Sequence, residues 1–451
     1  MSSLKISNSL TRSKDLFKPI NPKKVSMYVC GPTVYDNPHV GNARSLVVFD
    51  LLYRVLNKLY GKENVTYVRN ITDVDDKIIE ASKKRNVSID QVTTEVTKIF
   101  HENTKALNCL TPSVEPKATE HIKEMIEMIN SLIAKKLAYV NDGHVYFLIS
   151  GFKNYGKLSN KKLEELVAGS RVEVSKLKKD PLDFILWKPA LADEPGWDSP
   201  WGRGRPGWHL ECSVMSGKYL GKTFDIHGGG LDLLFPHHEN EIAQSCANNS
   251  TEILANYWVH NGFLTMKKEK MSKSLGNIQT ISEALEDYNG QVIRLALLSA
   301  HYKQPLDWNE NILEQNKVNL EKWYEVYDEK EKDTDISDIF SLLLDDLNTP
   351  KYFAKLHELY SSAAKGDQKS KDQFNSACRL IGIFNEKKDS LLKQKKNKSS
   401  VDEKYILGKI NERLQARKDG NYKLADQIRD DLLKKGIVIE DKQNKTEWKY
   451  K

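Results

Sequence analysis

The sequence has no run of eighteen consecutive apolar residues, so no segment is expected to cross a membrane as a helix. Its first stretch, MSSLKISNSLTRSKDLF, lacks the apolar part of a secretion signal, and we therefore expect a cytoplasmic protein. No CxxC pair occurs, which argues against a zinc finger of that pattern. An odd, scattered set of thiols also argues against a disulfide framework and leaves metal binding or burial for Cys30, Cys109, Cys212, Cys246 and Cys378.

The excess of positive charge is small. A formal net charge of +7 over 451 residues fits a polyanionic partner but does not require one. The length allows two or three domains.

The first part of the chain has the pattern of a βαβ unit. Residues 24–31 and 63–72 are rich in β-branched and aromatic side chains, whereas residues 42–60 have apolar side chains at helical spacing. Strand, helix and strand in this order predict a parallel sheet. A further strand, 223–230, runs into a glycine turn.

The middle and the end of the chain differ from this pattern. Between about residues 119 and 199 we expect an insertion, with an amphipathic helix, a hairpin turning at 141–143, and then a loop rich in Gly, Pro and Trp. From Glu310 onward the chain has a helical pattern, with Thr349 as an N-cap and Pro350 in the first turn. A small helical domain is predicted after a charged linker at 386–404, because apolar side chains recur there every four residues. They are Ile406, Ile410 and Leu414, then Leu424, Ile428 and Leu432.

The stretch FPHHENEIAQ, residues 235–244, concentrates side chains that bind metals. On a helix Glu241 shares a face with His237, four residues away, and nearly so with His238, three away, so spacing does not choose between them. Acidic residues at a solvated helix N-terminus explain the stretch without a metal. Cys30 and Cys212 follow or precede predicted strands and are candidates to join such a site at the carboxyl edge of the sheet.

Two further stretches are suited to phosphate. GPTVYDNPHVGNAR, residues 31–44, lies at a strand-to-helix junction, where backbone N–H groups and the helix dipole attract anions. KEKMSKSLGN, residues 268–277, is a cationic, hydroxyl-rich loop suited to closing on a triphosphate. Taken singly, a structural turn and a surface charge run explain them as well.

Together, HVGN and KMSKS resemble the paired signatures of class I aminoacyl-tRNA synthetases. The longer stretches MYVCGPTVYD, RNITDVDDKI, GRPGWHLECS, FDIHGGGLDLLFPHHENEIAQS and KEKMSKS are similar to the cysteinyl-tRNA synthetase family, from about Lys5 to the final WKYK. The resemblance implies an α/β fold: a Rossmann-type parallel-sheet catalytic domain at 1–310 with an inserted connective subdomain, and a C-terminal α-helical tRNA-binding region at 311–451. Its KMSKS loop would be 270–274.

The resemblance also implies one zinc ion per subunit, with the ligands Cys30, Cys212, His237 and Glu241; His238 and Glu239 would then support the site. Pocket shape alone separates cysteine from serine by only ~1–3 kcal/mol, whereas zinc prefers a thiolate to a hydroxyl.

The implied reaction joins L-cysteine to tRNA(Cys) through cysteinyl-adenylate, using ATP with Mg²⁺, in a monomer. The family's motifs place catalytic roles on His39, Asn42, Lys270 and Lys273, ATP contacts on Lys273, His39, Gly41, Gly229, Gly230 and Asp232, and cysteine contacts on Thr72, Trp208 and His227. Asn42 stands where the family often has a second histidine, so it would be a neutral donor.

Two other functions compete. A zinc-dependent ligase that joins cysteine to an amino sugar would share these motifs, but the long C-terminal region favours tRNA. A non-catalytic, zinc-stabilised RNA-binding protein would have no use for Lys270 and Lys273.

Overall fold

The structure is a computed structural model that describes residues 3–160, 176–266, 269–270, 278–330, 334–386, 403–435, 437–442 and 445–450. The chain divides into two compact units, Met1–Ile383 and Phe384–Lys451. The functional boundary that we place after residue 310 and the insertion bounds 119–199 remain predictions. Among the described helices, none combines the length and the apolar character needed to cross a membrane.

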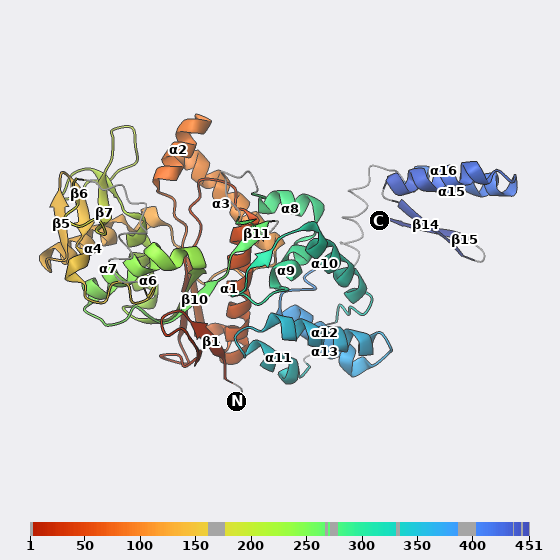
Figure 1. The fold of residues 1–451 in the computed structure, drawn as a ribbon, viewed down its shortest axis with the longest axis horizontal. Helices are drawn as coiled ribbons and strands as arrows, with labels where there is room; N and C mark the ends of the chain where they lie inside the picture. The colour runs from red at the N-terminus through yellow and green to blue at the C-terminus, as the bar shows by residue number, and fades with distance from the viewer. Residues whose placement is uncertain are drawn as a thin grey trace. The chain divides into compact units, whose positions relative to one another are not determined.

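A four-stranded parallel sheet of order β10-β9-β3-β4 forms the centre of the first unit (Figure 1). Its strands are β3 (Val25–Val29), β4 (Val65–Arg69), β9 (Phe224–Gly230) and β10 (Ala255–Asn261). Helix α1 (Val40–Tyr60) connects β3 to β4, which confirms the predicted βαβ unit. All five residues of β3 are buried, as expected for a parallel strand covered on both faces.

The chain order reverses between β3 and β9. From β3 the chain proceeds through α1 to β4 on one side, and from β9 through α7 (Glu239–Asn249) to β10 on the other. In open α/β sheets ligands bind beyond the carboxyl ends of the strands at such a switch point. The fold therefore directs attention to the residues that follow β3 and β9.

Helices α4 (Ile122–Ala134), α6 (Trp208–Leu220) and α7 share one apolar core with the sheet (Figure 1). The predicted stripe on α4 is buried at Ile122, Met125 and Ile129, and half-buried at Ile126 and Ile133. Beside these helices lies a second, antiparallel sheet of order β5-β6-β7-β8, made of β5 (Ala138–Asn141), β6 (His144–Phe147), β7 (Phe184–Pro189) and β8 (Gly204–Pro206).

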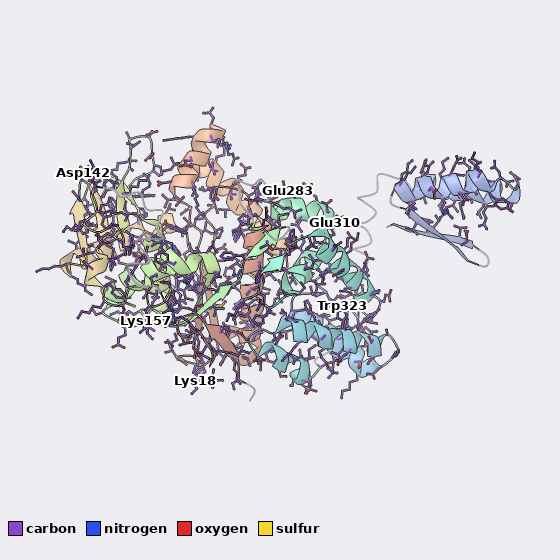
Figure 2. The ribbon with its side chains drawn as sticks, viewed as in Figure 1. Lys18, Asp142, Lys157, Glu283, Glu310 and Trp323 are labelled. Atoms are coloured by element: carbon purple, nitrogen blue, oxygen red, sulfur yellow. The ribbon has the colours of Figure 1, made fainter. Side chains whose placement is uncertain are left out.

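The predicted hairpin at 141–143 is confirmed. Asp142, labelled in Figure 2, and Gly143 have φ values of 50° and 71° in the turn between β5 and β6. Such left-handed conformations suit Asp and Gly in tight hairpins.

Helices dominate the rest of the first unit. They are α2 (Asp76–Arg85), α3 (Ile89–Ala106), α8 (Ile281–Asp287), α9 (Gly290–Leu298), α10 (Glu310–Trp323), α11 (Ser337–Leu343), α12 (Thr349–Ala363) and α13 (Gln368–Leu380). Trp323, at the end of α10, is buried against Phe374 of α13 with ring centroids 5.4 Å apart (Figure 2). Short strands β1 (Lys5–Asn8), β2 (Ser13–Leu16), β11 (Leu264–Met266), β12 (Glu269–Lys270) and β13 (Leu306–Asp307) complete it.

The N-cap predicted at Thr349 is wrong by one residue. Asn348 is the cap, because its side chain accepts a hydrogen bond from the backbone N–H of Lys351 at 3.2 Å. Thr349 and Pro350 are the first two helical residues. Asparagine is at least as good a cap as threonine, and it leaves proline in the first turn, where no N–H is needed.

The second unit pairs α15 (Glu403–Lys418) and α16 (Tyr422–Lys434) with a hairpin of β14 (Ile437–Lys442) and β15 (Lys445–Tyr450). Its core contains Ile406, Ile410, Ile428, Leu432 and Ile437, with Leu414 and Trp448 packed against it. The repeats of four therefore predicted most of this core, although Leu424 is exposed. The hairpin is an addition to the expected helices. Most of the predicted linker at 386–404 lies outside the described residues.

Candidate active site and metal centre

A cavity of about 350 Å³ opens at the switch point between β3 and β9. Its wall includes Cys30 after β3, His39 and Asn42 at the start of α1, Trp208 at the start of α6, and Asp232 after β9. An adjoining hollow of about 220 Å³ shares His39, Asn42, Asp232 and also Gly230 with this cavity, and adds Gly41. Residues predicted to bind metal, nucleotide and cysteine thus meet at one place, although up to 202 positions separate them along the chain.

The four predicted zinc ligands lie together. Cys30 Sγ is 3.7 Å from Cys212 Sγ, 3.5 Å from His237 Nε2 and 3.5 Å from Glu241 Oε1. His237 Nε2 is 2.9 Å from Glu241 Oε1. Cys212, His237 and Glu241 are buried, while Cys30 is partly exposed and contributes to the cavity wall.

These separations fit a zinc ion. Zinc lies about 2.3 Å from sulfur and about 2.0–2.1 Å from nitrogen, so neighbouring tetrahedral ligands are about 3.3–3.8 Å apart. The three separations made by Cys30 fall in this range. The shorter one, between His237 and Glu241, is a hydrogen bond between the two side chains. Two thiols, an imidazole and a carboxylate are also chemically suited to this metal.

A second set of four donors overlaps the first. Cys30, His227, His238 and Glu241 also bring one ligand atom each within 4.8 Å of one another, and Cys30 Sγ is 3.4 Å from His238 Nε2. The choice between His237 and His238, which spacing left open, is therefore not made by distance alone. The first set holds two thiols and the second only one, and soft thiolates favour zinc.

Hydrogen bonds from outside the cluster orient its imidazoles. His209 Nδ1 lies 2.9 Å from His237 Nδ1, which turns His237 Nε2 toward the thiols. Burial lowers the pKa of His209 to about 3, so this ring is neutral. On the other side, His238 Nδ1 is 2.8 Å from His260 Nε2. Such contacts set the tautomer and direction of metal-binding histidines.

Sequence reasoning missed His209, although it lies three residues before Cys212 and thus on nearly the same face of α6. It also missed His260, which the sequence places on a strand far from the histidine pair.

The charges of the cluster are distributed unequally. Burial alone would raise the pKa of Glu241, but electrostatic attraction to His227 and His237, together with hydrogen bonds to both, holds it well below its usual range. The hydrogen bond from Cys30 lowers the pKa of Cys212, whereas burial raises that of Cys30 well above its ordinary value. The shifts of Cys212 and Glu241 favour the deprotonated donors that a metal cation requires. Cys30 and His237 would release a proton on binding a metal, because the pKa of His237, which burial lowers, is raised to about 10 by Glu241.

The residues predicted to contact cysteine occupy two different positions. Trp208 lies on the cavity wall and stacks on His237, with ring centroids 4.2 Å apart. Within the described part of the chain, the wall contains neither Thr72 nor His227. His227 Nε2 lies 2.8 Å from Glu241 Oε2, and the Thr72 hydroxyl donates to Glu211 Oε2 at 2.8 Å.

Glu211 is a buried carboxyl group that sequence reasoning did not single out. Burial raises its pKa well above the usual range, and the neighbouring Cys212 adds to this effect. In the sequence, the only signal for Glu211 was its position next to a candidate ligand in WHLECS.

Glu239 has a structural role. Its carboxylate accepts hydrogen bonds from the backbone N–H groups of Gly156 and Ser159, at 3.0 and 2.8 Å, and so holds the loop after β6.

The start of α1 has a reciprocal capping arrangement. His39 is the N-cap, and its backbone N–H donates to Asn42 Oδ1 at 3.0 Å. The carboxamide oxygen of Asn42 is therefore engaged, and its amide nitrogen is the group suited to donate to a ligand.

The positions of the two predicted catalytic lysines stay predictions. Lys273 lies outside the described residues, and Lys270 is described only through its backbone in β12.

Gly229, predicted to approach the nucleotide, is constrained by packing. An ideal Cβ there would lie 2.9 Å from the His238 ring and 3.0 Å from Leu233. Only glycine fits between these side chains without displacing one of them.

Two family models match the chain: "tRNA synthetases class I (C) catalytic domain" over residues 16–318 and "Cysteinyl-tRNA ligase anticodon binding domain" over residues 410–448. Similar curated proteins include the cysteine–tRNA ligases of Pelagibacter ubique, 58% identical with 99% of each chain covered, and of Rickettsia bellii, 51% identical with 97% of each chain covered.

Solved structures with the same fold include methionyl-tRNA synthetase of Mycobacterium tuberculosis with methionyl-adenylate. It has a TM-score of 0.56 and 14% identity, over 80% of this chain and 89% of that one. The Agrobacterium radiobacter LeuRS–tRNA–LeuAMS complex also has a TM-score of 0.56, with 10% identity over 81% of this chain and 83% of that one. The predicted α/β fold and the resemblance seen in the motifs are both confirmed. The chain belongs to the cysteinyl-tRNA synthetase family of class I aminoacyl-tRNA synthetases.

Proposed function

We propose that this protein activates L-cysteine with ATP and transfers it to the 3′ end of tRNA(Cys). The observation that carries the proposal is the buried cluster of Cys30, Cys212, His237 and Glu241, which meets the cavity wall beside the start of α1. A zinc ion bound by these four residues would take up the thiolate of cysteine in preference to the hydroxyl of serine. The match over residues 410–448 supports tRNA, rather than an amino sugar, as the acceptor.

The chain's own residues supply positioning and charge stabilisation. The start of α1 presents backbone N–H groups and the positive end of a helix dipole to the phosphates of ATP-Mg²⁺, and we assign His39 and the Asn42 amide to the same phosphates. Lys270 and Lys273 neutralise the pyrophosphate as it leaves, in the role that the family motif implies. Gly41, Gly229, Gly230 and Asp232 approach the adenosine.

Trp208 forms the part of the cavity wall that the amino acid contacts. Thr72 and His227 do not line the wall and influence the site through other residues. Thr72 acts through its hydrogen bond to Glu211, and His227 through its hydrogen bond to Glu241. No residue of the protein needs to become covalently attached to the substrate, because bringing the carboxylate to the α-phosphate, and then the tRNA hydroxyl to the acyl carbon, is sufficient. We further propose that the protein acts in the cytoplasm as a monomer.

The test is exchange of pyrophosphate into ATP that depends on cysteine, with serine as the control amino acid, followed by charging of purified tRNA(Cys). We expect cysteine to support both steps and serine neither. Exchange without charging would point to another acceptor. Equal exchange with serine would refute the assigned role of the cluster.

A further inference from the structure

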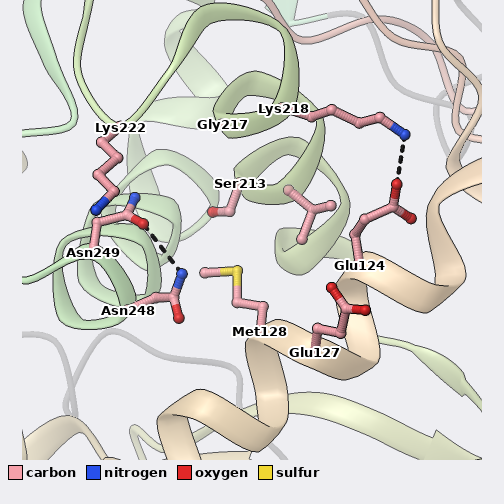
Figure 3. A pocket seen from close by; sticks show the side chains of 10 residues that line it. Glu124, Glu127, Met128, Ser213, Gly217, Lys218, Lys222, Asn248 and Asn249 are labelled. Atoms are coloured by element: carbon pink, nitrogen blue, oxygen red, sulfur yellow. Dashed lines mark hydrogen bonds and ion pairs between the residues drawn. The ribbon is translucent and has the colours of Figure 1, made fainter.

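A second cavity, of about 580 Å³, lies between α4, α6 and α7 (Figure 3). Although α6 and α7 also carry Cys212 and Glu241, this cavity is lined by none of the candidate catalytic or metal residues whose side chains the structure describes. Its walls are formed by Glu124, Glu127, Met128, Ser213, Val214, Gly217, Lys218, Lys222, Asn248 and Asn249. The volume lies within the range of small-molecule sites, roughly 300–1,000 Å³.

Gly217 keeps this cavity open. It lies within α6, where glycine costs about 1 kcal/mol relative to alanine. An ideal Cβ at this position would have no other heavy atom within 4 Å, so the fold does not require glycine there for packing. The missing side chain exposes the space above Met128 and Val214, which are buried and form an apolar floor.

The charges around this floor have opposite signs on opposite walls. Lys222 and Asn249 lie together on one side in Figure 3, and Glu127 lies on the other, with Met128 between them. A neighbouring pair, Lys218 with Glu124, is already neutralised by a salt bridge. Neither Lys222 nor Glu127 forms an ion pair with any residue that the structure describes.

We propose that this cavity binds a zwitterionic dipeptide with an apolar side chain. Its carboxylate accepts hydrogen bonds from Lys222 and from the amide of Asn249, whose oxygen already accepts from Asn248 at 3.2 Å. Its ammonium group pairs with Glu127, and its apolar side chain covers Met128. In a free amino acid one carbon separates the two charges, whereas two extended residues span up to about 7 Å and so reach further between the two walls.

Isothermal titration of the full chain with glycyl-L-leucine tests the proposal. We expect saturable binding at one site per chain, and no binding of N-acetyl-glycyl-L-leucine amide, which lacks both charges. Free L-leucine is expected to bind at least tenfold more weakly than the dipeptide. Added L-cysteine is not expected to compete, because its expected site is the other cavity.

Variants locate the binding. Glu127→Gln and Lys222→Gln are each expected to weaken it about three- to fivefold, as exposed ion pairs do. Gly217→Leu, which fills the cavity, is expected to abolish it. Lys123→Gln is the matched control, since Lys123 is an exposed residue of α4 that does not line the cavity.

Three results would overturn the proposal: no saturable binding of glycyl-L-leucine, equal binding of its blocked form or of free leucine, or unchanged affinity in both charge variants. The charge variants decide the outcome even if Gly217→Leu does not fold.

Discussion

The carboxylate of Asp50 holds several elements of the first unit together through buried arginine. Asp50 on α1 is bonded to Arg294 of α9, and its other oxygen accepts the backbone N–H of Leu110 at 2.6 Å. Arg294 also donates to the carbonyl oxygens of Leu107 at 3.1 Å and Ile381 at 2.6 Å. Asp50 and Arg294 are 2% and 0% exposed, so no water can replace a lost partner.

Asp50→Asn keeps the shape of the side chain and removes its charge. The Arg294 guanidinium would then remain buried without a counter-charge, and removing one partner of a buried ion pair costs about 3–5 kcal/mol. Against a typical stability of about 5–15 kcal/mol, this is a large fraction. Arg54, the second partner of Asp50 at 2.7 Å, is partly exposed, so water compensates its loss in part.

Urea denaturation followed by tryptophan fluorescence measures this cost. The matched control is Asp345→Asn, which breaks the exposed pair with Lys14, whose side chains are 41% and 45% exposed. Exposed pairs contribute about 0–1 kcal/mol. A loss of stability in Asp50→Asn no greater than in Asp345→Asn would refute the reasoning.

The same pair has a pH signature. Burial would raise the pKa of Asp50, but Arg294 and Arg54 outweigh it and lower the pKa below its ordinary value. The unfolded chain therefore binds this proton more readily, so the pair's contribution is complete above about pH 4, the usual pKa of an unfolded aspartate, and is lost as the pH falls further. We expect Asp50→Asn to flatten the decline of stability over this acidic range.

Three other predictions concern the catalytic unit. Cys212→Ser should lower both the zinc content, measured by mass spectrometry, and the preference for cysteine over serine in pyrophosphate exchange. Cys246→Ala, which removes a buried thiol of α7 that is not among the four candidate ligands, should change neither. Lys273→Ala should slow pyrophosphate exchange about 100- to 1,000-fold, as expected for the loss of about 2.7–4 kcal/mol of transition-state stabilisation, and a normal rate would rule out its role. Gly31→Ala should lower the melting temperature and the zinc content, because a Cβ would lie 1.6 Å from the backbone oxygen of Asn70; an unchanged variant would show that β3 and β4 can separate freely.

Local patterns predicted the elements better than their ends. The parallel βαβ unit, the α4 stripe and the β5–β6 hairpin follow from short-range periodicity and turn chemistry, and the structure contains all three. The cap of α12 was misplaced because Asn348 and Thr349 are both good caps, and only the hydrogen bond to Lys351 distinguishes them. The β14–β15 hairpin was missed because its strands depend on pairing with each other, which no single-strand pattern in a charged segment reveals.

By itself, the sequence determined the family, the kinds of donor atoms available and the two phosphate-suited stretches, because these depend on residue type and local spacing. Only the tertiary structure brought Cys30 within 3.7 Å of Cys212, 182 positions away. It also showed that His237 and His238 both reach Cys30, and that His209 and His260 orient them. Such contacts depend on how the sheet and the helices pack, and a distance across the fold leaves no periodic trace in the chain.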